Sequence, residues 1–328
     1  MKNKSISYAK YGYIFSIPFF VAWLIFSLYP TLYTIIIGFT DLQGVSKTSW
    51  HFLDDIFANY KIILTSPTFR TAFKNTFLIW ICNFIPQIVL ALFLASVFTN
   101  RRMKLHGAGA YKVLFYMPNI ITASTVAILF AALFGHPMGP VNDLLTRFHI
   151  IDKPFNFLVS KTAARIIVIF IQTWMWYGYT MIIMISGILG ISPEIFEAAD
   201  IDGANNWQVF WKITIPSIKT ILLFTLITSM IGGLTMFDIP QLFINNGGPD
   251  NATLTTSVFI YAQAFKGGYM YNRASAASMI MFIIIVALSG VLFFVLRDKD
   301  AAEQKKMLRI QKREEKLALK KIKEARND

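Results

Sequence analysis

Six apolar segments recur along this sequence, and together they restrict its fold more than any other feature. A helix needs roughly 20 apolar residues to cross the hydrocarbon core of a bilayer, and each segment is at least that long. Inside the bilayer every backbone N–H and C=O group must be paired within the protein, which favours helices for segments of this length. The sequence therefore predicts an all-α membrane protein with six transmembrane helices. The segments are residues 11–39, 76–98, 111–134, 163–190, 213–237 and 274–296.

Lysine and arginine are distributed unevenly between the loops that join these segments. They gather before the first, between the second and third, and after the sixth, which all lie on one side of a six-span topology. Because basic residues concentrate in cytoplasmic loops, we expect both termini in the cytoplasm of a cell (inner or plasma) membrane. The net charge of +13 then reflects orientation, and no nucleic-acid partner is expected. The residues concerned are Lys2, Lys4, Lys10, Arg101, Arg102, Lys104, Lys112, Arg297, Lys299, Lys305 and Lys306.

A polar, acidic interruption separates the fourth and fifth apolar segments, and we refer to residues 192–216 as the polar loop. Ser192 and Pro193 predict a helix start, with the serine hydroxyl as a cap and proline at the first helical position. Gly203 predicts the end of that helix, since glycine accepts the backbone conformation found there. A second short helix is expected from Asn206 to Ile213. The polar loop should therefore hold two short helices at an angle, just outside the bilayer.

The spacing inside the polar loop resembles the cytoplasmic signature of ATP-binding-cassette (ABC) importer permeases. That signature reads E-A-A, three residues, G, nine residues and I-x-L-P, and only Ile215 departs from it, where the family usually has leucine. In that family this loop is the coupling helix, which docks in a cleft of the ATPase subunit. The residues that the resemblance assigns to coupling are Glu197, Ala198, Ala199, Asp200, Gly203, Ile213 and Pro216.

Further stretches extend the resemblance over nearly the whole chain. FANY at 57–60, AFKNT at 72–76, YKVLFYMPN at 111–119 and GGP at 247–249 are similar to the maltose and glycerol-phosphate branch of these permeases. The resemblance implies a type I ABC importer permease fold and one subunit of a binding-protein-dependent sugar importer, forming half of the translocation pathway. The implied partners are a second homologous permease subunit, two ABC ATPase subunits, an extracytoplasmic sugar-binding protein and membrane lipid.

Sequence motifs for catalysis or metal binding are missing. There is no GxxxxGK[ST] phosphate-binding loop and no GxSxG motif, and the four histidines are scattered. The single cysteine, Cys82, lies in an apolar segment and has no second cysteine to pair with. We therefore expect no enzyme activity, no catalytic residue, no metal and no cofactor in this chain, with ATP bound by a partner subunit.

The fourth apolar segment carries a polar and aromatic face without a deep charge. Gln172, Trp176 and Tyr179 follow i, i+4, i+7 spacing, so they share one side of a helix. An amide beside aromatic rings suits sugar hydroxyl groups and C–H faces, while helix packing and interfacial anchoring remain the alternative. Offsets from the family's motifs assign a sugar site to Gln172, Met175, Trp176, Tyr179, Met230, Gly233, Leu234 and Phe237. Trp176 replaces a small residue of the maltose subunit, which leaves the same cargo in doubt.

Three regions follow: residues 1–10 as a cytoplasmic N-terminus, 11–296 as the transmembrane permease domain, and 297–328 as a basic cytoplasmic tail. We expect the tail to lie against anionic lipid, with an ATPase contact as the alternative. Other functions remain open. Glycerol phosphate or a related polyol ester is the rival cargo, while an ion-coupled secondary transporter or a membrane scaffold would leave the signature unexplained.

Overall fold

The computed structural model describes residues 9–45, 49–103, 105–244, 247–296, 307 and 311. Helices dominate these residues, and the β-type pairing described among them is one isolated bridge between Thr40 and Phe52. The prediction of an all-α chain is confirmed. Most of the N-terminal region 1–10, Lys104 and nearly all of the tail 297–328 lie outside the described residues.

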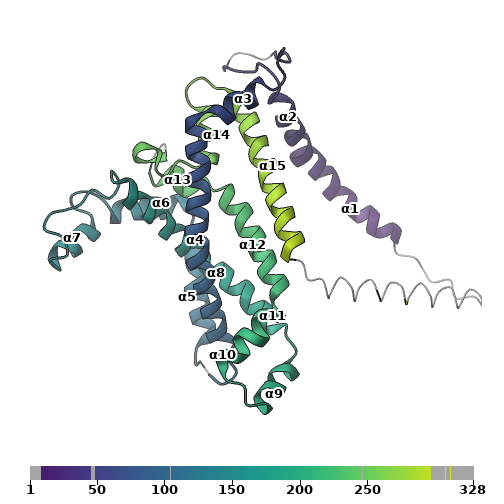
Figure 1. Ribbon diagram of the computed structural model, residues 1–328, viewed down its shortest axis with the longest axis vertical. Coiled ribbons are helices and arrows are strands. Elements are labelled where there is room, and N and C mark those ends of the chain that lie inside the picture. The colour runs from purple at the N-terminus through teal and green to yellow at the C-terminus, as the bar shows by residue number, and fades with distance from the viewer. Residues whose placement is uncertain are drawn as a thin grey trace, which may run out of the picture. The chain divides into compact units, whose positions relative to one another are not determined.

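Short and long helices alternate along the chain, and Figure 1 labels most of them. The elements are α1 (Ala9–Trp23), the π-helix η1 (Leu24–Leu28), α2 (Tyr29–Ile37), α3 (Ala58–Thr65), α4 (Pro67–Thr99), α5 (Ala108–Ile120), α6 (Ala123–Leu133), α7 (Pro140–Arg147), α8 (Lys161–Leu189), α9 (Pro193–Ile201), α10 (Asn206–Val209), the π-helix η2 (Phe210–Thr214), α11 (Ile215–Ser217), α12 (Lys219–Leu234), α13 (Asp238–Leu242), the 3₁₀ turn η4 (Pro249–Asn251), α14 (Thr256–Phe265) and α15 (Tyr271–Leu296).

Among the described residues, five helical stretches are long and apolar enough to cross a membrane. They are Lys10–Ile37, Pro67–Thr99, Lys161–Leu189, Lys219–Leu242 and Tyr271–Leu296. The pair α5 and α6 makes a sixth candidate if both helices belong to one crossing. A multi-pass membrane protein is therefore confirmed, with five or six apolar spans.

The third predicted span, residues 111–134, is wrong as a continuous helix. The chain leaves the helical conformation at Thr122 (φ −63°, ψ 144°), whose side chain accepts a hydrogen bond from Thr125 N and so caps α6. Pro118 lies in the last turn of α5 and leaves one backbone carbonyl without its usual helical donor. A proline followed by a threonine cap thus explains why one helix ends and another begins here.

The fifth predicted span, residues 213–237, also differs. Residues 210–217 form a π-helical turn and a short helix that contains Pro216, so the long helix α12 begins only at Lys219. At its other end α12 stops at Leu234, and α13 follows as a separate short helix. The break before α12 lies at Ile218 (φ −94°, ψ 12°), while Ile215, the residue before Pro216, keeps a helical backbone.

The chain forms two compact units, each described here by itself. Unit 1 comprises residues 1–84, 121–173 and 232–286, and unit 2 comprises residues 85–120, 174–231 and 287–328. Four of the five boundaries fall inside α4, α8, α12 and α15, and the fifth follows the last residue of α5. The polar loop belongs entirely to unit 2.

In unit 1, residues 247–256 form a turn-rich segment fixed by buried hydroxyl groups. The side chains of Thr253, Thr255 and Thr256 are completely buried. Thr76 Oγ1 accepts a hydrogen bond from Thr256 N at 2.9 Å, and Thr255 at the start of α14 caps that helix. The hydroxyl groups of Thr76, Thr255 and Thr256 have partners and hold this segment against α4, whereas the buried Thr253 hydroxyl has none among the described residues.

Asn75 and Arg165 add a second set of contacts to the turn-rich segment. Asn75 Nδ2 donates to the carbonyl oxygens of Asn251 (2.6 Å) and Leu254 (3.2 Å). Arg165 donates from Nε to Ala252 O and from Nη2 to Asn75 Oδ1, both at 3.0 Å. One asparagine and one arginine therefore satisfy several carbonyl groups in a segment whose regular structure is limited to the turn η4 and the start of α14.

The core of unit 2 lies between the C-terminal halves of α4 and α8. Ala91, Ala95, Met181 and Met184 are completely buried there, with larger aliphatic side chains around them. At Gly178 an added Cβ would overlap the carbonyl group of Phe115, so α5 and α8 approach closely through a residue without a side chain. This packed core holds the C-terminal halves of α4 and α8 together, next to the polar loop.

Candidate functional site

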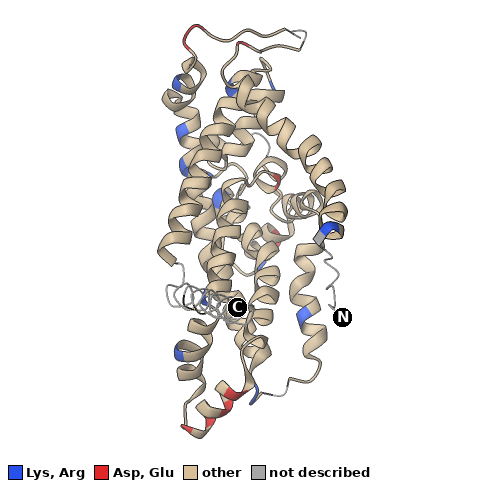
Figure 2. Cartoon of the chain, turned by 90° about the vertical axis from the view of Figure 1, so that its right-hand side faces the viewer, with Lys and Arg blue, Asp and Glu red and all other residues tan. Residues whose placement is uncertain are grey.

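The polar loop begins with α9, a helix whose exposed face is acidic. Pro193 occupies its first turn as predicted, beside Glu194. In Figure 2 the red colour of acidic residues gathers on the ribbon of this short helix. Glu194 lies in the first turn, where the positive end of the helix dipole favours negative charge. The expected serine cap is wrong: Ser192 has a non-helical backbone, but its side chain makes no capping hydrogen bond among the described contacts. Proline at the first position lowers the need for that cap, because it has no N–H group.

Gly203 ends α9 in the left-handed conformation, with φ at +71°. Ala204 N donates to Ala199 O at 2.9 Å, and Gly203 N donates to Asp200 O at 3.2 Å, which closes the helix end. The predicted helix end at this glycine is confirmed. No described neighbour lies within 4 Å of a Cβ built there, so a side chain would be opposed by backbone strain alone.

The second short helix of the polar loop starts with a complete capping box. Asn205 Oδ1 accepts from Gln208 N, and Gln208 Oε1 accepts from Asn205 N, both at 2.9 Å. The predicted helix 206–213 is observed as α10 continued by the π-helix η2, which contains Ile213. Pro216 lies in α11, immediately before α12, as expected for the entry to the next span.

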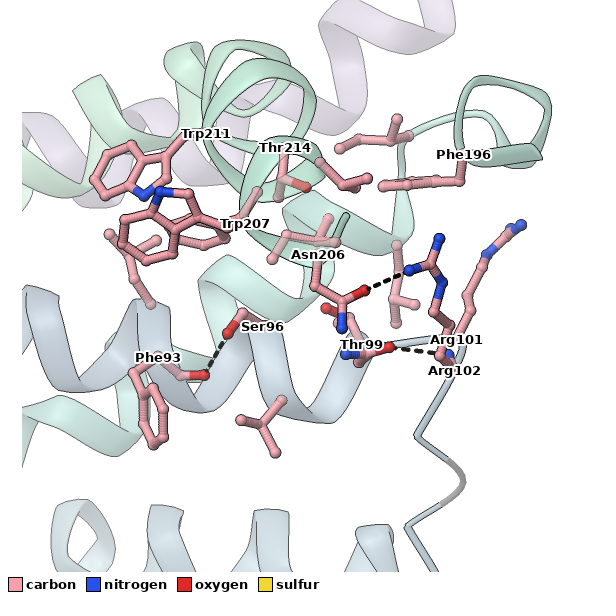
Figure 3. Close-up of a pocket in the computed structure, with 18 of the residues that line it drawn as sticks. Phe93, Ser96, Thr99, Arg101, Arg102, Phe196, Asn206, Trp207, Trp211 and Thr214 are labelled. Atoms are coloured by element: carbon pink, nitrogen blue, oxygen red, sulfur yellow. Dashed lines mark hydrogen bonds between the residues drawn. The ribbon is translucent and has the colours of Figure 1, made fainter. Parts of the chain in front are cut away.

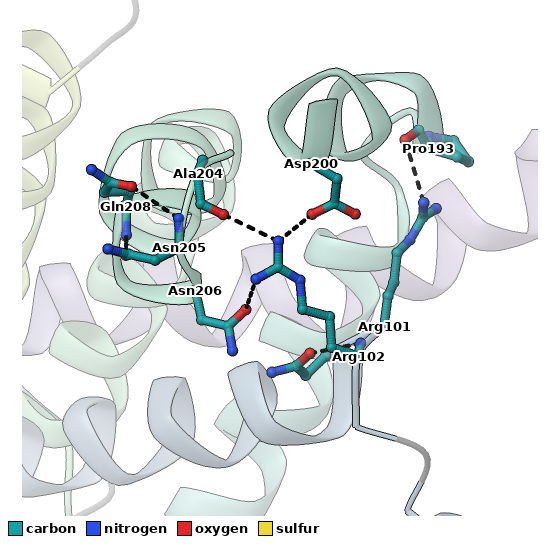
Figure 4. A network of polar contacts seen from close by, with 9 residues as sticks. Arg101, Arg102, Pro193, Asp200, Ala204, Asn205, Asn206 and Gln208 are labelled. Carbon is teal, nitrogen blue, oxygen red and sulfur yellow. Dashed lines mark hydrogen bonds and ion pairs between the residues drawn. The ribbon is translucent and has the colours of Figure 1, made fainter. Parts of the chain in front are cut away.

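Arg102, in the turn after α4, contacts three parts of the polar loop (Figure 4). Its Nη2 lies 2.5 Å from Asp200 Oδ1 in α9 and 3.1 Å from Ala204 O in the glycine turn. Its Nη1 donates to Asn206 Oδ1 in α10 at 3.3 Å. The sequence analysis assigned Arg102 only to membrane orientation, and no local pattern could pair it with residues about a hundred positions away.

The described contacts of Arg101 with other residues all lie in α9. Its Nη1 lies 3.5 Å from Glu197 Oε1 and 3.4 Å from Pro193 O, and its guanidinium stands 5.3 Å from the centre of the Phe196 ring. Glu197 remains 67% exposed despite this neighbour. Its carboxylate is therefore weakly held within the chain and open to a further basic group.

A groove of about 560 Å³ lies between the polar loop and the ends of α4 and α8 in unit 2 (Figure 3). Its lining is largely apolar and includes Phe93, Leu189 and Phe196. Trp207 and Trp211 stand edge to face at 5.5 Å between ring centres, and Trp207 is 70% exposed. The groove thus joins the apolar surface of two spans to the charged turn at Arg101 and Arg102.

In unit 2, two of the residues predicted to contact sugar are accessible. Trp176 and Tyr179 are 45% and 41% exposed, and their rings meet edge to face at 5.9 Å. Met175 and Met230 are buried. An exposed aromatic pair on a membrane helix suits the flat face of a sugar, but the assignment of all four residues stays a prediction.

In unit 1, the other four predicted residues are more enclosed. Gln172 is buried, with Nε2 3.9 Å from Met236 Sδ, and Leu234 is buried as well. At Gly233 an added Cβ would overlap the Trp80 ring, and the ring of Phe237 packs on Tyr261 at 5.1 Å. Their role in binding sugar also stays a prediction.

Among the described residues, no group of three or more His, Cys, Asp or Glu side chains is arranged to hold a metal ion. The described residues therefore offer a preformed polar loop, an apolar groove and an aromatic pair, without a cluster suited to metal chemistry. Together with the apolar spans, they define a helical, multi-pass membrane protein that exposes a preformed polar loop.

Comparison with known families agrees with this class. Residues 75–299 match the family described as "Binding-protein-dependent transport system inner membrane component". The match covers more than half of the chain, so the chain belongs to this family. It is a transport component rather than an enzyme.

Curated relatives match over nearly their full lengths. The chain is 31% identical over 290 residues to the lactose transport system permease protein LacF of Rhizobium radiobacter, covering 88% of this chain and 94% of that protein. It is 28% identical over 281 residues to the arabinooligosaccharides transport system permease protein AraP of Bacillus subtilis, covering 84% and 85%. Both relatives are permease proteins of sugar transport systems.

A solved structure shows the same fold. One chain of a bacterial ABC transporter involved in the import of the acidic polysaccharide alginate superposes with a TM-score of 0.73 at 23% identity. The match covers 87% of this chain and 94% of that chain. The ABC importer permease fold predicted from the sequence is thereby confirmed.

Proposed function

We propose that this chain is the transmembrane permease subunit of an ATP-driven, binding-protein-dependent sugar importer. It would form half of the translocation pathway and couple it to an ATPase. The observation that carries the proposal is the polar loop: its E-A-A–Gly–I-x-x-P spacing coincides with two short helices between α8 and α12, the second of which starts with a capping box. Relatives named for lactose and arabinooligosaccharide transport support sugar as cargo over a polyol ester.

The proposed mechanism is alternating access. An extracytoplasmic binding protein delivers sugar, two ATPase subunits close on ATP, and their closure moves the polar loop of this chain and of a second permease subunit. ATP binds to the ATPase partners and not to this chain. Glu197, Ala198, Ala199, Asp200, Gly203, Ile213 and Pro216 form or position the docking surface in this proposal.

Sugar contact is proposed on the aromatic pair Trp176 and Tyr179 of unit 2. Gln172, which the sequence spacing predicts on the same helix face, is buried in unit 1 and its contact with sugar is a separate prediction. Exposed rings can pack on C–H groups, while amide and phenol groups accept and donate hydrogen bonds to hydroxyl groups. Replacing Tyr179 by alanine should change uptake kinetics or sugar preference while leaving assembly with the ATPase intact. Unchanged kinetics after substitution of all three residues would reject this site.

The proposed orientation places both termini and the polar loop in the cytoplasm. In a Cys82→Ser background, an impermeant thiol reagent added outside intact cells should label Asp54→Cys and Asp250→Cys but not Asn205→Cys. Permeabilised cells provide the control, since all three positions are exposed and should then react. The reverse pattern would place the polar loop outside and end the coupling proposal.

The decisive experiment uses the assembled transporter in liposomes. Gly203→Asp and Glu197→Lys should insert and pair with the second permease subunit, yet lose ATPase association or the stimulation of hydrolysis by loaded binding protein. Asp54→Lys makes the same charge change as Glu197→Lys at an exposed carboxylate outside the polar loop and serves as the matched control. Normal stimulated hydrolysis and normal uptake in both loop variants would refute the proposal. Uptake driven by an ion gradient without ATP would favour a secondary transporter instead.

A further inference from the structure

Arg102 is the one described side chain that hydrogen-bonds α9, the glycine turn and α10 together. We propose that Arg102 is a positioning residue that sets the angle between α9 and α10, so that the turn after α4 belongs to the coupling apparatus. Only the expected effect of Arg102 on transport rests on the proposed function of the chain. The angle itself is a property of unit 2.

Apart from the Arg102 contacts, the described hydrogen bonds that join α9 to the turn before α10 are backbone bonds, among them Ala204 N to Ala199 O and Gly203 N to Asp200 O. Of the nine described residues of α9, only Ala199 is buried, and α10 has four residues. Helices this short are not stable by themselves and depend on contacts with their surroundings. The capping box orders the start of α10 but makes no bond to α9. Between them stands Gly203, whose surroundings leave open space for movement.

The chemistry of arginine suits this task. Its planar guanidinium presents several N–H donors in a rigid fork, so two nitrogens can serve three oxygens at once. Asp200 supplies a carboxylate, Ala204 a backbone carbonyl and Asn206 a side-chain amide oxygen, each from a different part of the loop. Asn100 Oδ1 accepts from Arg102 N at 2.9 Å and so orders the turn from which the fork extends. A lysine in this position could donate hydrogen bonds to only some of these three oxygens.

Arg101 provides a matched control within the same turn. It carries the same charge, is exposed to a similar degree (47% against 46%), and contacts α9 but makes no described bond to α10. Arg101→Gln and Arg102→Gln therefore remove equal charge from adjacent positions. Only Arg102→Gln removes the side-chain hydrogen bonds that link α9 to α10.

The test is a distance measurement in the assembled transporter in lipid nanodiscs. In a Cys82→Ser background, spin labels at Glu194→Cys and Lys212→Cys report the separation between α9 and the end of the second helical segment. We expect a narrow distance distribution in the parent and in Arg101→Gln, a broad one in Arg102→Gln, and partial narrowing in Arg102→Lys. A distribution in Arg102→Gln as narrow as in the parent overturns the inference.

ATP hydrolysis by the same samples separates positioning from general damage. Arg102→Gln should lower hydrolysis stimulated by loaded binding protein roughly three- to thirtyfold, the range of known coupling effects, with basal hydrolysis and KM for ATP unchanged. Loss of basal hydrolysis together with subunit dissociation would overturn a specific positioning role. A broad distance distribution with normal stimulation would uphold the positioning of α10 by Arg102 and refute the polar loop as the coupling element.

Discussion

Two connecting segments of this molecule are each held by hydrogen bonds from one arginine. One arginine lies in an exposed environment and the other beside buried side chains. Arg102 holds the polar loop of unit 2 through an ion pair whose side chains are 46% and 50% exposed. Arg165 holds the turn-rich segment of unit 1 through a carbonyl and an asparagine, beside threonines that are completely buried. Exposed ion pairs contribute little to stability, whereas buried polar groups are costly once a partner is lost. The Arg102 contacts set the direction of α10 relative to α9. The Arg165 contacts hold the turn-rich segment in one conformation.

The largest expected effect is at Asn75. Alanine there removes both Nδ2 hydrogen bonds to the turn-rich segment and the acceptor of Arg165 Nη2, which leaves buried groups unpaired. We expect a loss of about 2–4 kcal/mol in the free energy of unfolding. Asn206→Ala removes one exposed acceptor from Arg102 and should cost far less. Denaturant titration of both variants in detergent measures the difference, and equal losses would abolish the contrast between the two segments.

Gly203 in the polar loop and Gly247 in the turn-rich segment both have positive φ, so alanine substitutions there compare the two segments directly. Alanine at Gly203 meets open space and should cost about 1 kcal/mol from backbone strain alone. At Gly247 (φ +88°) the added Cβ would also overlap the backbone and side chain of Leu254. Overpacking of this kind adds about 1–3 kcal/mol, so Gly247→Ala should be the more destabilising variant. Thermal unfolding midpoints test the order, and a larger shift for Gly203→Ala would contradict it.

The smallest effect on stability is expected from Asp200→Asn. Because the Arg102–Asp200 pair is half exposed, neutralising it should change the free energy of unfolding by less than about 1 kcal/mol. High salt should reduce even this difference through screening. Asp143→Asn, which breaks an exposed pair with Arg147 on α7, is the matched control. A loss of several kcal/mol at Asp200 would mean that the polar loop is a stability element like the turn-rich segment.

Hydropathy alone predicted the helical membrane fold, since long apolar segments have few other possible structures. Span boundaries were less accurate where helix-breaking chemistry lies inside an apolar segment. Pro118 and Thr122 divide the third segment, and both signals are visible in the sequence once a cap at Thr122 is considered. The π-helix at Phe210–Thr214 has no comparable sequence signal, because it depends on how one turn meets its surroundings.

The polar loop was predicted well for a different reason. Pro193 and Gly203 act on their own backbone, so their effects can be read locally. Arg102 was missed because its role arises only when two loops meet in space. The same limit applies to Glu197, which the sequence assigned to coupling without indicating its neighbour Arg101.

The capping box satisfies two N–H groups at the start of α10, those of Asn205 and Gln208, without help from any partner chain. A cleft that receives this loop therefore meets an element that is already ordered, and the entropy lost on association should be small. The heat-capacity change of association should then follow the apolar area buried at the interface, with no added contribution from folding. Calorimetry over a range of temperatures would reveal this as a shallow dependence of the association enthalpy on temperature.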